Sequence, residues 1–472
     1  MSRFPIALLA GAFVLSSCGG GADGVGGAVP FHARSDSPMS GTIPISHVII
    51  MIQENRSFNN LFATFPGADG TTKGQKGKKT ISLKQVNLVW PCDFGHSRSG
   101  YLKDYDAGKM DGFYLEGGGH GSKCTVLAGR NPYQYVNPAQ ITPYWDIAGQ
   151  YVLADQMFQT QGSGSFTGHQ DLIRGGTTFD SALSEALVDF PTGTPWGCDA
   201  PSGTRTSQLV WTGSKMEGPK PGPFPCTNQF PGSGSYYKTL ADLLDAKSVT
   251  WKYYTPSMGG AGALWNAFDM ISSVRNGPEW TTNIVTPERK ILGDIKNGTL
   301  ASVSWVVPDA PFSDHPGPGS GAGGPSWVAS VVNAIGLSPY WGSTAIIITW
   351  DDWGGFYDPV PPPPIGPSQQ FDHWGGLGFR VPMMIVSPYA REAVPSKPGY
   401  ISHTQYEFGS IIKFVEDIWS LGSLNTTDTR ANSIIDSFDF SQPPRAFTKI
   451  PSSFSRSYFE RLPPSHEPID SE

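Results

Sequence analysis

Two continuous apolar runs stand out in the pattern of hydrophobic and polar positions along this chain. Residues 47–53 read His-Val-Ile-Ile-Met-Ile-Gln, and residues 344–350 read Thr-Ala-Ile-Ile-Ile-Thr-Trp. A strand with one solvated face alternates between apolar and polar residues, whereas a strand buried on both faces does not. We therefore predict that both runs form buried strands of a mainly parallel sheet.

Shorter segments of the same pattern extend this prediction to an α/β fold. Further strands are expected at residues 151–154, 249–254, 300–307 and 381–387. Helical patterns occur at residues 58–62, 141–150, from His169 onward, and at 237–246, 326–336 and 405–419. Because strands alternate with helices, we expect a three-layer sandwich with a mainly parallel central sheet.

Two long segments rich in glycine, proline and polar residues interrupt this pattern, at 66–140 and 190–235. Loops this long are usually functional or belong to inserted subdomains. They carry four cysteines, which in an oxidising compartment suggest two disulfides. Proximity favours Cys92–Cys124 and Cys198–Cys226, although three pairings are possible. A zinc site is the competing interpretation, and no Cys-x-x-Cys spacing supports it.

The first residues have the pattern of an export signal, with a short apolar core that is too short to span a membrane. Leu15-Ser16-Ser17-Cys18 resembles a bacterial lipobox, which predicts a lipid on Cys18 and membrane association through it; ordinary signal-peptide cleavage is the alternative. We expect a periplasmic or cell-surface lipoprotein, or otherwise a secreted protein. The predicted divisions are a signal peptide at 1–18, a flexible tether at 19–42, the main domain at 43–425 and an extended C-terminal segment at 426–472.

Composition narrows the classes of partner. The net charge is −7, and no long basic run is present. Binding to nucleic acid requires clustered Lys and Arg opposite the phosphates, so we expect no nucleic-acid partner. A small phosphate ester needs only a local site and is not excluded.

Acidic and amide side chains follow directly after both apolar runs. Glu54 and Asn55 end the first run, and Asp351 and Asp352 end the second. Ligands of open α/β sheets bind beyond the carboxyl ends of the strands. These hard oxygen donors would suit one divalent cation, Mg²⁺, Ca²⁺ or Mn²⁺, with Zn²⁺ also compatible. A solvated turn is the alternative for the two aspartates. Arg56 could favour an anionic substrate nearby.

A hydroxyl and several histidines could complete a hydrolytic site. Ser165 lies in a Gly-x-Ser turn before a helical pattern, where it is either a nucleophile or a helix cap. A metal ion could depress the pKa of its hydroxyl. Histidines could donate protons to phosphoryl oxygens or to a leaving alkoxide, although a single histidine is more often structural. The loop histidines are His96, His169, His315 and His403, with His373 as a weaker candidate.

Four motifs in this order resemble the bacterial phosphoesterase family, which contains the non-specific phospholipases C and the respiratory-burst-inhibiting acid phosphatase. They are Glu54-Asn55-Arg56-Ser57-Phe58, Lys109-Met110-Asp111-Gly112-Phe113, Ser313-Asp314-His315-Pro316, and the run from Thr349 to Asp358. The resemblance extends from about His47 to Leu424. It implies an alkaline-phosphatase-like fold and hydrolysis of phosphate esters.

The resemblance also implies roles for individual residues. Glu54, Asn55, Asp351 and Asp352 match the metal-binding positions of the family, and Ser165 falls at the nucleophile position beside the metal. His96 and His315 match phosphate-proximal histidines, and His169 falls where phospholipase members often have Asn or Arg. The chain departs from the family at Gly164, which replaces a proline, at Asp352-Trp353, where many members have Glu-His, and at Pro359, where phospholipase-type members often have His.

We therefore expect an exported, metal-dependent phosphoesterase of the phospholipase C type with a serine nucleophile. Its substrate would be a phospholipid or another phosphate ester. An acid phosphatase that acts on soluble phosphomonoesters is the nearest alternative. A surface binding protein that keeps the fold without catalysis is the alternative of another class.

Overall fold

The structure is a computed structural model that describes residues 43–116, 132–232, 234–363, 376–394 and 399–466. The expected signal peptide, the lipidated Cys18, the tether, Cys124 and His373 lie outside the described residues. In the part that is described, no helix is long and apolar enough to cross a membrane.

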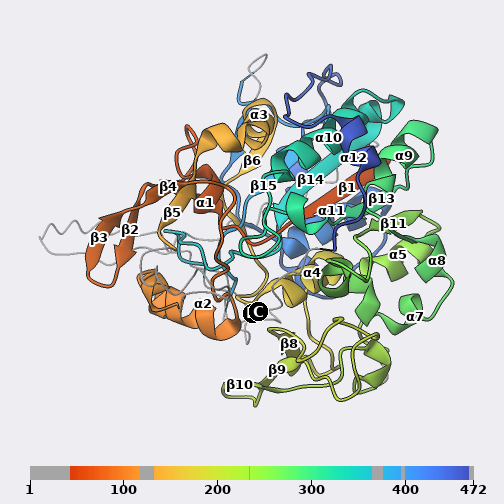
Figure 1. The fold of residues 1–472 in the computed structure, drawn as a ribbon. Helices are drawn as coiled ribbons and strands as arrows, with labels where there is room; N and C mark the ends of the chain where they lie inside the picture. Colours follow the sequence, from red (N-terminus) through yellow and green to blue (C-terminus); the bar gives the residue numbers. More distant parts are fainter. Residues whose placement is uncertain (1–42, 117–131, 233, 364–375, 395–398, 467–472) are drawn as a thin grey trace, which may run out of the picture. The chain divides into compact units, whose positions relative to one another are not determined.

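A sheet of eight described strands forms the centre of the compact unit that begins at Ile43 (Figure 1). Its order is β12-β11-β13-β1-β14-β15-β6-β16, and only β15 runs antiparallel to its neighbours. The predicted mainly parallel α/β sheet is therefore confirmed. The strands are β1 (His47–Gln53), β6 (Val152–Ala154), β11 (Trp251–Tyr254), β12 (Ile284–Val285), β13 (Val303–Val306), β14 (Thr344–Trp350), β15 (Met383–Val386) and β16 (Tyr400–Ser402).

Helices cover both faces of this sheet (Figure 1). On one face, the indole N–H of Trp305 in β13 donates to the backbone oxygen of Leu172 in α4 (3.0 Å). On the other, Trp350 of β14 packs edge-on against Tyr144 of α3, with 5.1 Å between the ring centres. The first layer contains α4 (Ser165–Arg174) and α11 (Phe408–Trp419), and the second contains α3 (Thr142–Gln150), α9 (Lys290–Asn297), α10 (Gly324–Gly336) and α12 (Arg456–Arg461). The predicted three-layer sandwich is thus present.

Most predicted elements agree with the structure to within a few residues, with one exception near the site. Helix α4 begins at Ser165, one turn before His169, where the helical pattern was expected to start. The glycines on either side of Ser165 hid the first turn, because glycine is a poor helix former. As a consequence, Ser165 and His169 lie on the same helix, four positions apart. The remaining helices are short: α1 (Phe58–Phe62), α5 (Leu240–Ala246), α6 (Gly262–Trp265), α7 (Ser272–Arg275) and α8 (Glu279–Thr282).

The two long polar segments form small substructures of their own. The first contains the hairpin of β2 (Lys73–Lys76) and β3 (Lys79–Ser82), the pair β4 (Lys84–Val86) and β5 (Gln134–Val136), and helix α2 (Arg98–Tyr105). The second long polar segment contributes β9 (Ser207–Trp211) and β10 (Met216–Pro221) to a three-stranded sheet with β8 (Glu185–Val188). Outside both segments, β7 (Met157–Phe158) pairs with β17 (Tyr406–Glu407). The Cys198–Cys226 disulfide is present as predicted. The Cys92–Cys124 pairing includes a residue outside the described ranges and stays a prediction.

The C-terminal segment packs against the second helical layer. After α11 the chain continues through short 3-10 turns and coil to α12. Phe459 of α12 packs against Trp327 of α10, with 5.3 Å between the ring centres. The expected extended segment from 426 therefore contains at least one short helix that joins the core.

Candidate active site

The carboxyl ends of β1 and β14 bring the predicted acidic residues together. Gln53 and Trp350 pair in register at the last positions of these strands, so the residues that follow leave the sheet side by side. The backbone N–H of Asn55 donates to Oδ1 of Asp351 (3.0 Å) and joins the two ends. The predicted donors at both strand ends are completely buried, namely Glu54, Asn55, Asp351 and Asp352.

Asn55 connects these strand ends to three of the predicted catalytic side chains. Its φ of 57° lies in the left-handed region, which Asn adopts more readily than most residues. Its Nδ2 lies 3.0 Å from Nε2 of His96 and 3.1 Å from Nε2 of His315. Its Oδ1 accepts a hydrogen bond from Oγ of Ser165 (3.2 Å). One amide side chain therefore contacts the predicted nucleophile and both predicted phosphate-proximal histidines.

The other partners of the two imidazoles fix the positions of their protons. Nδ1 of His96 lies 2.6 Å from the carbonyl oxygen of Phe94, and Nδ1 of His315 lies 2.5 Å from that of Pro316. A carbonyl oxygen can only accept, so each Nδ1 carries a proton and each Nε2 accepts from the amide of Asn55. Both rings consequently present a basic nitrogen to the site.

Ser165 occupies the first position of α4, with its hydroxyl 3.0 Å from Oδ2 of Asp352. The N–H groups in the first turn of a helix have no intrahelical partners, and this end of α4 therefore favours an anion. Gly168 allows the helix to approach the strand end. A Cβ at that position would lie only 2.6 Å from the backbone oxygen of Asp351. The serine thus sits where an anionic group would meet both the hydroxyl and the helix end.

Glu54, His169 and Asp351 form a second group of donors. Nε2 of His169 lies 3.0 Å from Oε1 of Glu54 and 3.9 Å from Oδ2 of Asp351, and one donor atom from each residue fits within 4.8 Å. Oε2 of Glu54 and Oδ2 of Asp351 have no hydrogen-bond partner among the described residues. A buried carboxylate oxygen without a donor is costly, so this group fits a cation.

The shifted pKa values of the site also favour a bound cation. Burial raises the pKa of Glu54 well above its usual value, and the nearby Asp351 and Asp352 raise it further. Burial and Asp351 also raise the pKa of Asp352. Burial lowers the pKa of His169 to about 4, so this imidazole is neutral near pH 7 and adds no positive charge. A divalent cation would supply positive charge beside these carboxyl groups and would stabilise their ionised form.

Several contacts of the two histidines were not predicted. Asp93 lies between the rings, with Oδ1 3.9 Å from Nδ1 of His96 and Oδ2 4.0 Å from Nε2 of His315. Aromatic rings also border them: Phe190 and Trp353 lie 6.0 and 6.1 Å from the ring of His96, and Trp265 lies 5.7 Å from that of His315. Asp93, Phe190 and Trp353 come from loops whose paths the sequence does not fix, and Trp265 ends the short helix α6. Of these residues, only Trp353 could have been placed near the site from the sequence, because it follows Asp351-Asp352 directly.

Arg56 anchors the segment that carries His315. Its guanidinium donates to the carbonyl oxygen of Asp314 (2.9 and 2.7 Å), to that of Leu88 (2.8 Å) and to Oδ1 of Asn60 (3.2 Å). It also lies over the ring of Phe356, 4.7 Å from the centre. The structure therefore gives Arg56 a structural role in place of the expected one beside an anionic substrate.

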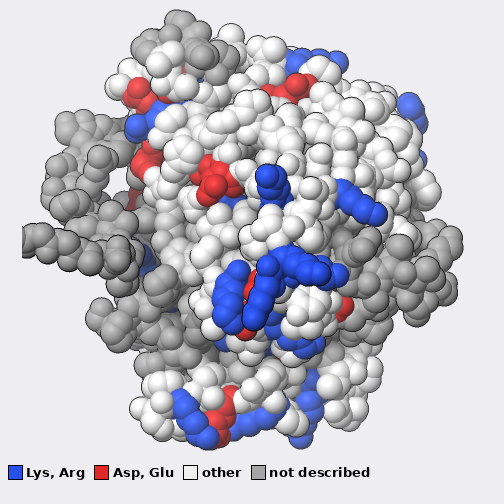
Figure 2. Space-filling model, turned by 90° about the vertical axis from the view of Figure 1, so that its left-hand side faces the viewer, with Lys and Arg blue, Asp and Glu red and all other residues white. Residues whose placement is uncertain are grey.

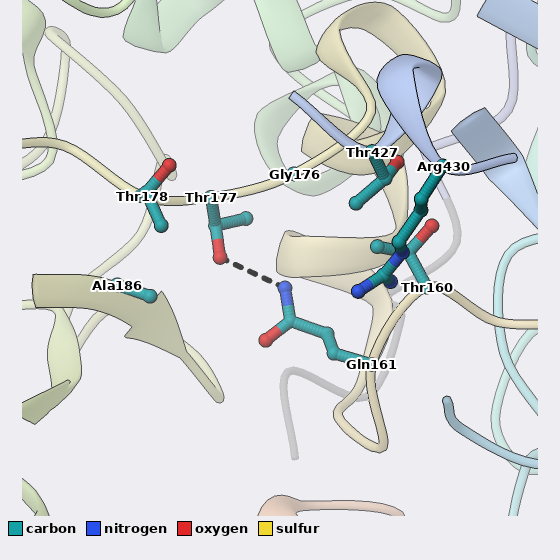
Figure 3. Close-up of a pocket in the computed structure, with 8 residues that line it drawn as sticks. All are labelled: Thr160, Gln161, Gly176, Thr177, Thr178, Ala186, Thr427 and Arg430. Atoms are coloured by element: carbon teal, nitrogen blue, oxygen red, sulfur yellow. Dashed lines mark hydrogen bonds between the residues drawn. The ribbon is translucent and has the colours of Figure 1, made fainter. Parts of the chain in front are cut away.

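Two other features lie apart from these donors. His403 is an exposed side chain bound to Asp155 (2.9 Å). Figure 3 shows a pocket in which Gln161 donates to Thr177 (2.8 Å). The charge of Arg430 in its lining is balanced by Glu407 (2.8 Å), so the lining is not arranged for a phosphate. The pocket is lined by Thr160, Gln161, Gly176, Thr177, Thr178, Ala186, Thr427 and Arg430, none of which is a predicted site residue.

Comparison with known proteins identifies relatives over most of the chain. The model of the Phosphoesterase family matches residues 45–422. The non-hemolytic phospholipase C of Pseudomonas aeruginosa is 26% identical over 88% of this chain and 60% of its own length. Phospholipase C B of Mycobacterium tuberculosis is 24% identical over 85% of this chain and 78% of its own length. This chain thus spans less than two thirds of the Pseudomonas protein.

A comparison of folds also identified a solved structure that is similar to this chain. A protein in the alkaline phosphatase superfamily from Vibrio parahaemolyticus aligns with 84% of this chain and 72% of its own chain. The two sequences are 10% identical in that alignment, and the TM-score is 0.35.

Proposed function

This chain belongs to the phosphoesterase family, and on that premise we propose that it hydrolyses phosphate esters, as a phospholipase C type enzyme with Ser165 as nucleophile. One observation carries the proposal. The hydroxyl of Ser165 lies within 3.2 Å of Asn55 and Asp352, and Asn55 in turn holds two basic imidazole nitrogens. A phosphoryl group placed at this hydroxyl would meet proton donors and acceptors on several sides.

We propose that one divalent cation completes the site. The predicted donors Glu54, Asn55, Asp351, Asp352 and Ser165 would hold it, and the position of His169 beside Glu54 and Asp351 adds a nitrogen donor. The partnerless oxygens of Glu54 and Asp351 support this fit. When bound, the ion would polarise the phosphoryl group and lower the pKa of the serine hydroxyl. A nitrogen ligand favours Zn²⁺ over Mg²⁺, Mn²⁺ or Ca²⁺.

The side chains of the protein can then carry out the proton transfers. Ser165 Oγ attacks phosphorus, its proton passes to Oδ2 of Asp352, and the bond from phosphorus to the leaving oxygen breaks. Nε2 of His315, which takes up a proton from solvent before the ester binds, donates that proton to the leaving oxygen, and Asp93 stabilises the imidazolium. Water then attacks the phosphoserine, Nε2 of His315 accepts a proton from the water, and Oγ leaves phosphorus and takes back the proton held by Asp352. His96 would donate to a phosphoryl oxygen from Nε2 only in its doubly protonated form, with Asp93 beside the ring stabilising the imidazolium.

The substrate class separates two versions of this proposal. The phospholipase C names of the relatives support a phospholipid diester, with a diacylglycerol leaving group. An acid phosphatase would act on soluble monoesters instead. Trp353 departs from many members of the family and Pro359 from the phospholipase-type members, and Trp353 borders His96 directly. A comparison of nitrophenyl phosphate, nitrophenyl phosphorylcholine and phosphatidylcholine as substrates distinguishes the two.

Replacement of the serine tests the mechanism. We expect Ser165→Ala to lower kcat by at least about 10³-fold, because the covalent route is lost. Ser330→Ala is the matched control, since Ser330 is also a buried helical serine and its hydroxyl has no hydrogen-bond partner among the described residues. Unchanged hydrolysis by Ser165→Ala would contradict the nucleophile. No hydrolysis of any ester by metal-loaded wild-type protein would favour the non-catalytic binding protein.

Export by way of a lipidated Cys18 is a separate proposal. The Cys198–Cys226 disulfide supports an oxidising compartment, because such bonds are rare in the cytosol. We expect the protein in the membrane fraction, and we expect Cys18→Ala to release it. Equal membrane association of both proteins would contradict the lipid anchor.

A further inference from the structure

A compact group of lysines lies on the substructure formed by the first long polar segment. Residues 73–89 contain five lysines and no acidic residue, although the whole chain has a net charge of −7. Four of the lysines are exposed, and none of these four forms an ion pair with a described residue. The five are Lys73, Lys76, Lys78, Lys79 and Lys84, on the β2–β3 hairpin and at the start of β4.

Exposed apolar side chains accompany the lysines. Leu102 in α2 is 50% exposed, and Leu115 is 54% exposed. The N–H of Gly77 at the hairpin turn donates to the backbone oxygen of Asp111 (2.9 Å), and Lys76 lies over the ring of Tyr114, 5.5 Å from its centre. These contacts fix the hairpin against the segment that carries Leu115. The hairpin lysines therefore lie beside the segment that carries Leu115, and α2, which carries Leu102, contacts that same segment, Phe113–Leu115.

Acidic residues on this surface do not cancel its charge. Asp106 is paired with Lys109 (2.8 Å), and the buried Glu116 lies 3.7 Å from Lys103. Asp106 and Glu116 are thus each matched by a lysine outside the group of five, whereas Asp111, half-buried beside the hairpin turn, lies near the same Asp106–Lys109 pair. Figure 2 faces the side of the molecule that carries β2, β3 and α2, and shows Lys and Arg side chains gathered near the middle of it.

The surface is linked to the candidate active site through α2. This helix is capped by Ser97, directly after His96. Tyr101 of α2 packs against Trp353, with 6.2 Å between the ring centres, and Trp353 borders the ring of His96. A partner that contacts Leu102 would therefore lie against the same helix whose start holds a predicted catalytic histidine.

We propose that the hairpin lysines, with Leu102 and Leu115, dock this protein on the surface of an anionic phospholipid bilayer. Lysine side chains are attracted to anionic headgroups, while leucines enter the boundary between headgroups and acyl chains. A bilayer engages both kinds of side chain at once, whereas a soluble polyanion engages only the charges. The link to catalysis rests on the proposed function, but the docking itself does not.

Vesicle sedimentation tests the docking without turnover, with the Ser165→Ala background to keep the lipid intact. We compare vesicles of pure phosphatidylcholine with vesicles that contain phosphatidylglycerol. We expect tighter binding to the anionic vesicles and its loss at high salt, since salt screens exposed charges. Replacement of Lys73, Lys78, Lys79 and Lys84 by Gln should weaken binding on the order of 1,000-fold. Lys76 is kept because it packs on Tyr114.

The control removes the same charge from another part of the chain. Lys238, Lys247, Lys290 and Lys296 are exposed, and their replacement by Gln should leave vesicle binding unchanged. Equal losses in the two quadruple variants would show a general charge effect and overturn the proposal. The same holds if the hairpin variant binds like wild type.

A leucine variant distinguishes binding to a bilayer from binding to a soluble polyanion. We expect Leu102→Ser with Leu115→Ser to weaken vesicle binding while the fold is kept, because both side chains are exposed. If the protein binds a single-stranded oligonucleotide as tightly as vesicles, and the leucine variant binds vesicles like wild type, the surface is a polyanion site and the bilayer is excluded. Hydrolysis of nitrophenyl esters is measured separately, so a failure of the proposed function does not affect this result.

Discussion

Replacement of Arg56 by Lys tests whether this guanidinium holds the site together or binds the substrate. The guanidinium donates to three buried acceptors, the backbone oxygens of Asp314 and Leu88 and the side chain of Asn60. A lysine ammonium keeps a positive charge but donates from a single point, so it cannot reach acceptors on separate sides. We expect two of the three acceptors to lose their donor.

The magnitude follows from those losses. A buried acceptor left without a donor costs about 1–3 kcal/mol, so Arg56→Lys should lower the free energy of unfolding by about 3 kcal/mol. Burial lowers the pKa of Arg56 to about 10, so the native side chain is still charged near pH 7 and the comparison is between two cations. Urea unfolding followed by tryptophan fluorescence measures the loss. Arg461→Lys is the control, because Arg461 is exposed.

The kinetic result separates the two roles. Because Arg56 holds the Asp314 peptide next to His315, the variant should have a lower kcat on nitrophenyl phosphate with little change in KM. A substrate-binding arginine would give the opposite result. A raised KM with unchanged kcat, and a stability within about 1 kcal/mol of wild type, would refute the anchoring role.

Three further predictions concern the cation, pH and the disulfide. His169→Asn should lower the affinity of the metal-free protein for Zn²⁺ by at least about tenfold, because imidazole is a favoured zinc ligand, and should lower the affinity for Mg²⁺ much less. Elemental analysis after dialysis measures the metal content, with His96→Asn as the control. Equal metal content in both variants would contradict the prediction. Burial and Asp309 raise the pKa of Glu288 from 4.5 to about 7, so this group favours the folded state below pH 4.5 and its contribution is lost as pH rises through 7. Relative to Glu288→Gln, wild type should therefore lose about 3 kcal/mol of stability between these pH values, as measured by urea unfolding, and a difference that does not change with pH would argue against it. Replacement of Cys198 and Cys226 by Ala, which opens a loop with a separation of 28 residues, should cost about 3–4 kcal/mol and lower the melting temperature; an unchanged value would show that the loop model fails here.

The sequence was sufficient for the sheet because its strands carry a strong local signal. The runs that became β1 and β14 are buried over nearly their whole length, and their boundaries were predicted to the residue. Parallel strands deliver their carboxyl ends to the same edge, so Glu54 and Asp351 could be placed together before their contacts were known. The direction of β15 was not predictable, since a short apolar run looks the same in either direction.

The candidate site was predicted only as far as the strand ends and motifs reach. His96 and Asp93 come from a loop that is distant in sequence from both strands, and no periodicity fixes the path of such a loop. Helix α4 was placed one turn late because glycines flank Ser165. The position of His169 beside Glu54 therefore could not be inferred, since it depends on the turn of helix that begins at Ser165.

The register of β1 has a consequence for the order in which this protein can fold. The backbone of Asn55 and the side chain of Asp351 meet across 296 positions of the chain, and β1 pairs on its other side with β13. A ribosome that has made only the first half of the protein has therefore supplied neither neighbour of the first strand. Contacts this distant carry a large entropic cost of loop closure, which slows folding. We expect the emerging chain to stay without its central sheet until β14 has been synthesised, so that the site assembles late and in a single step.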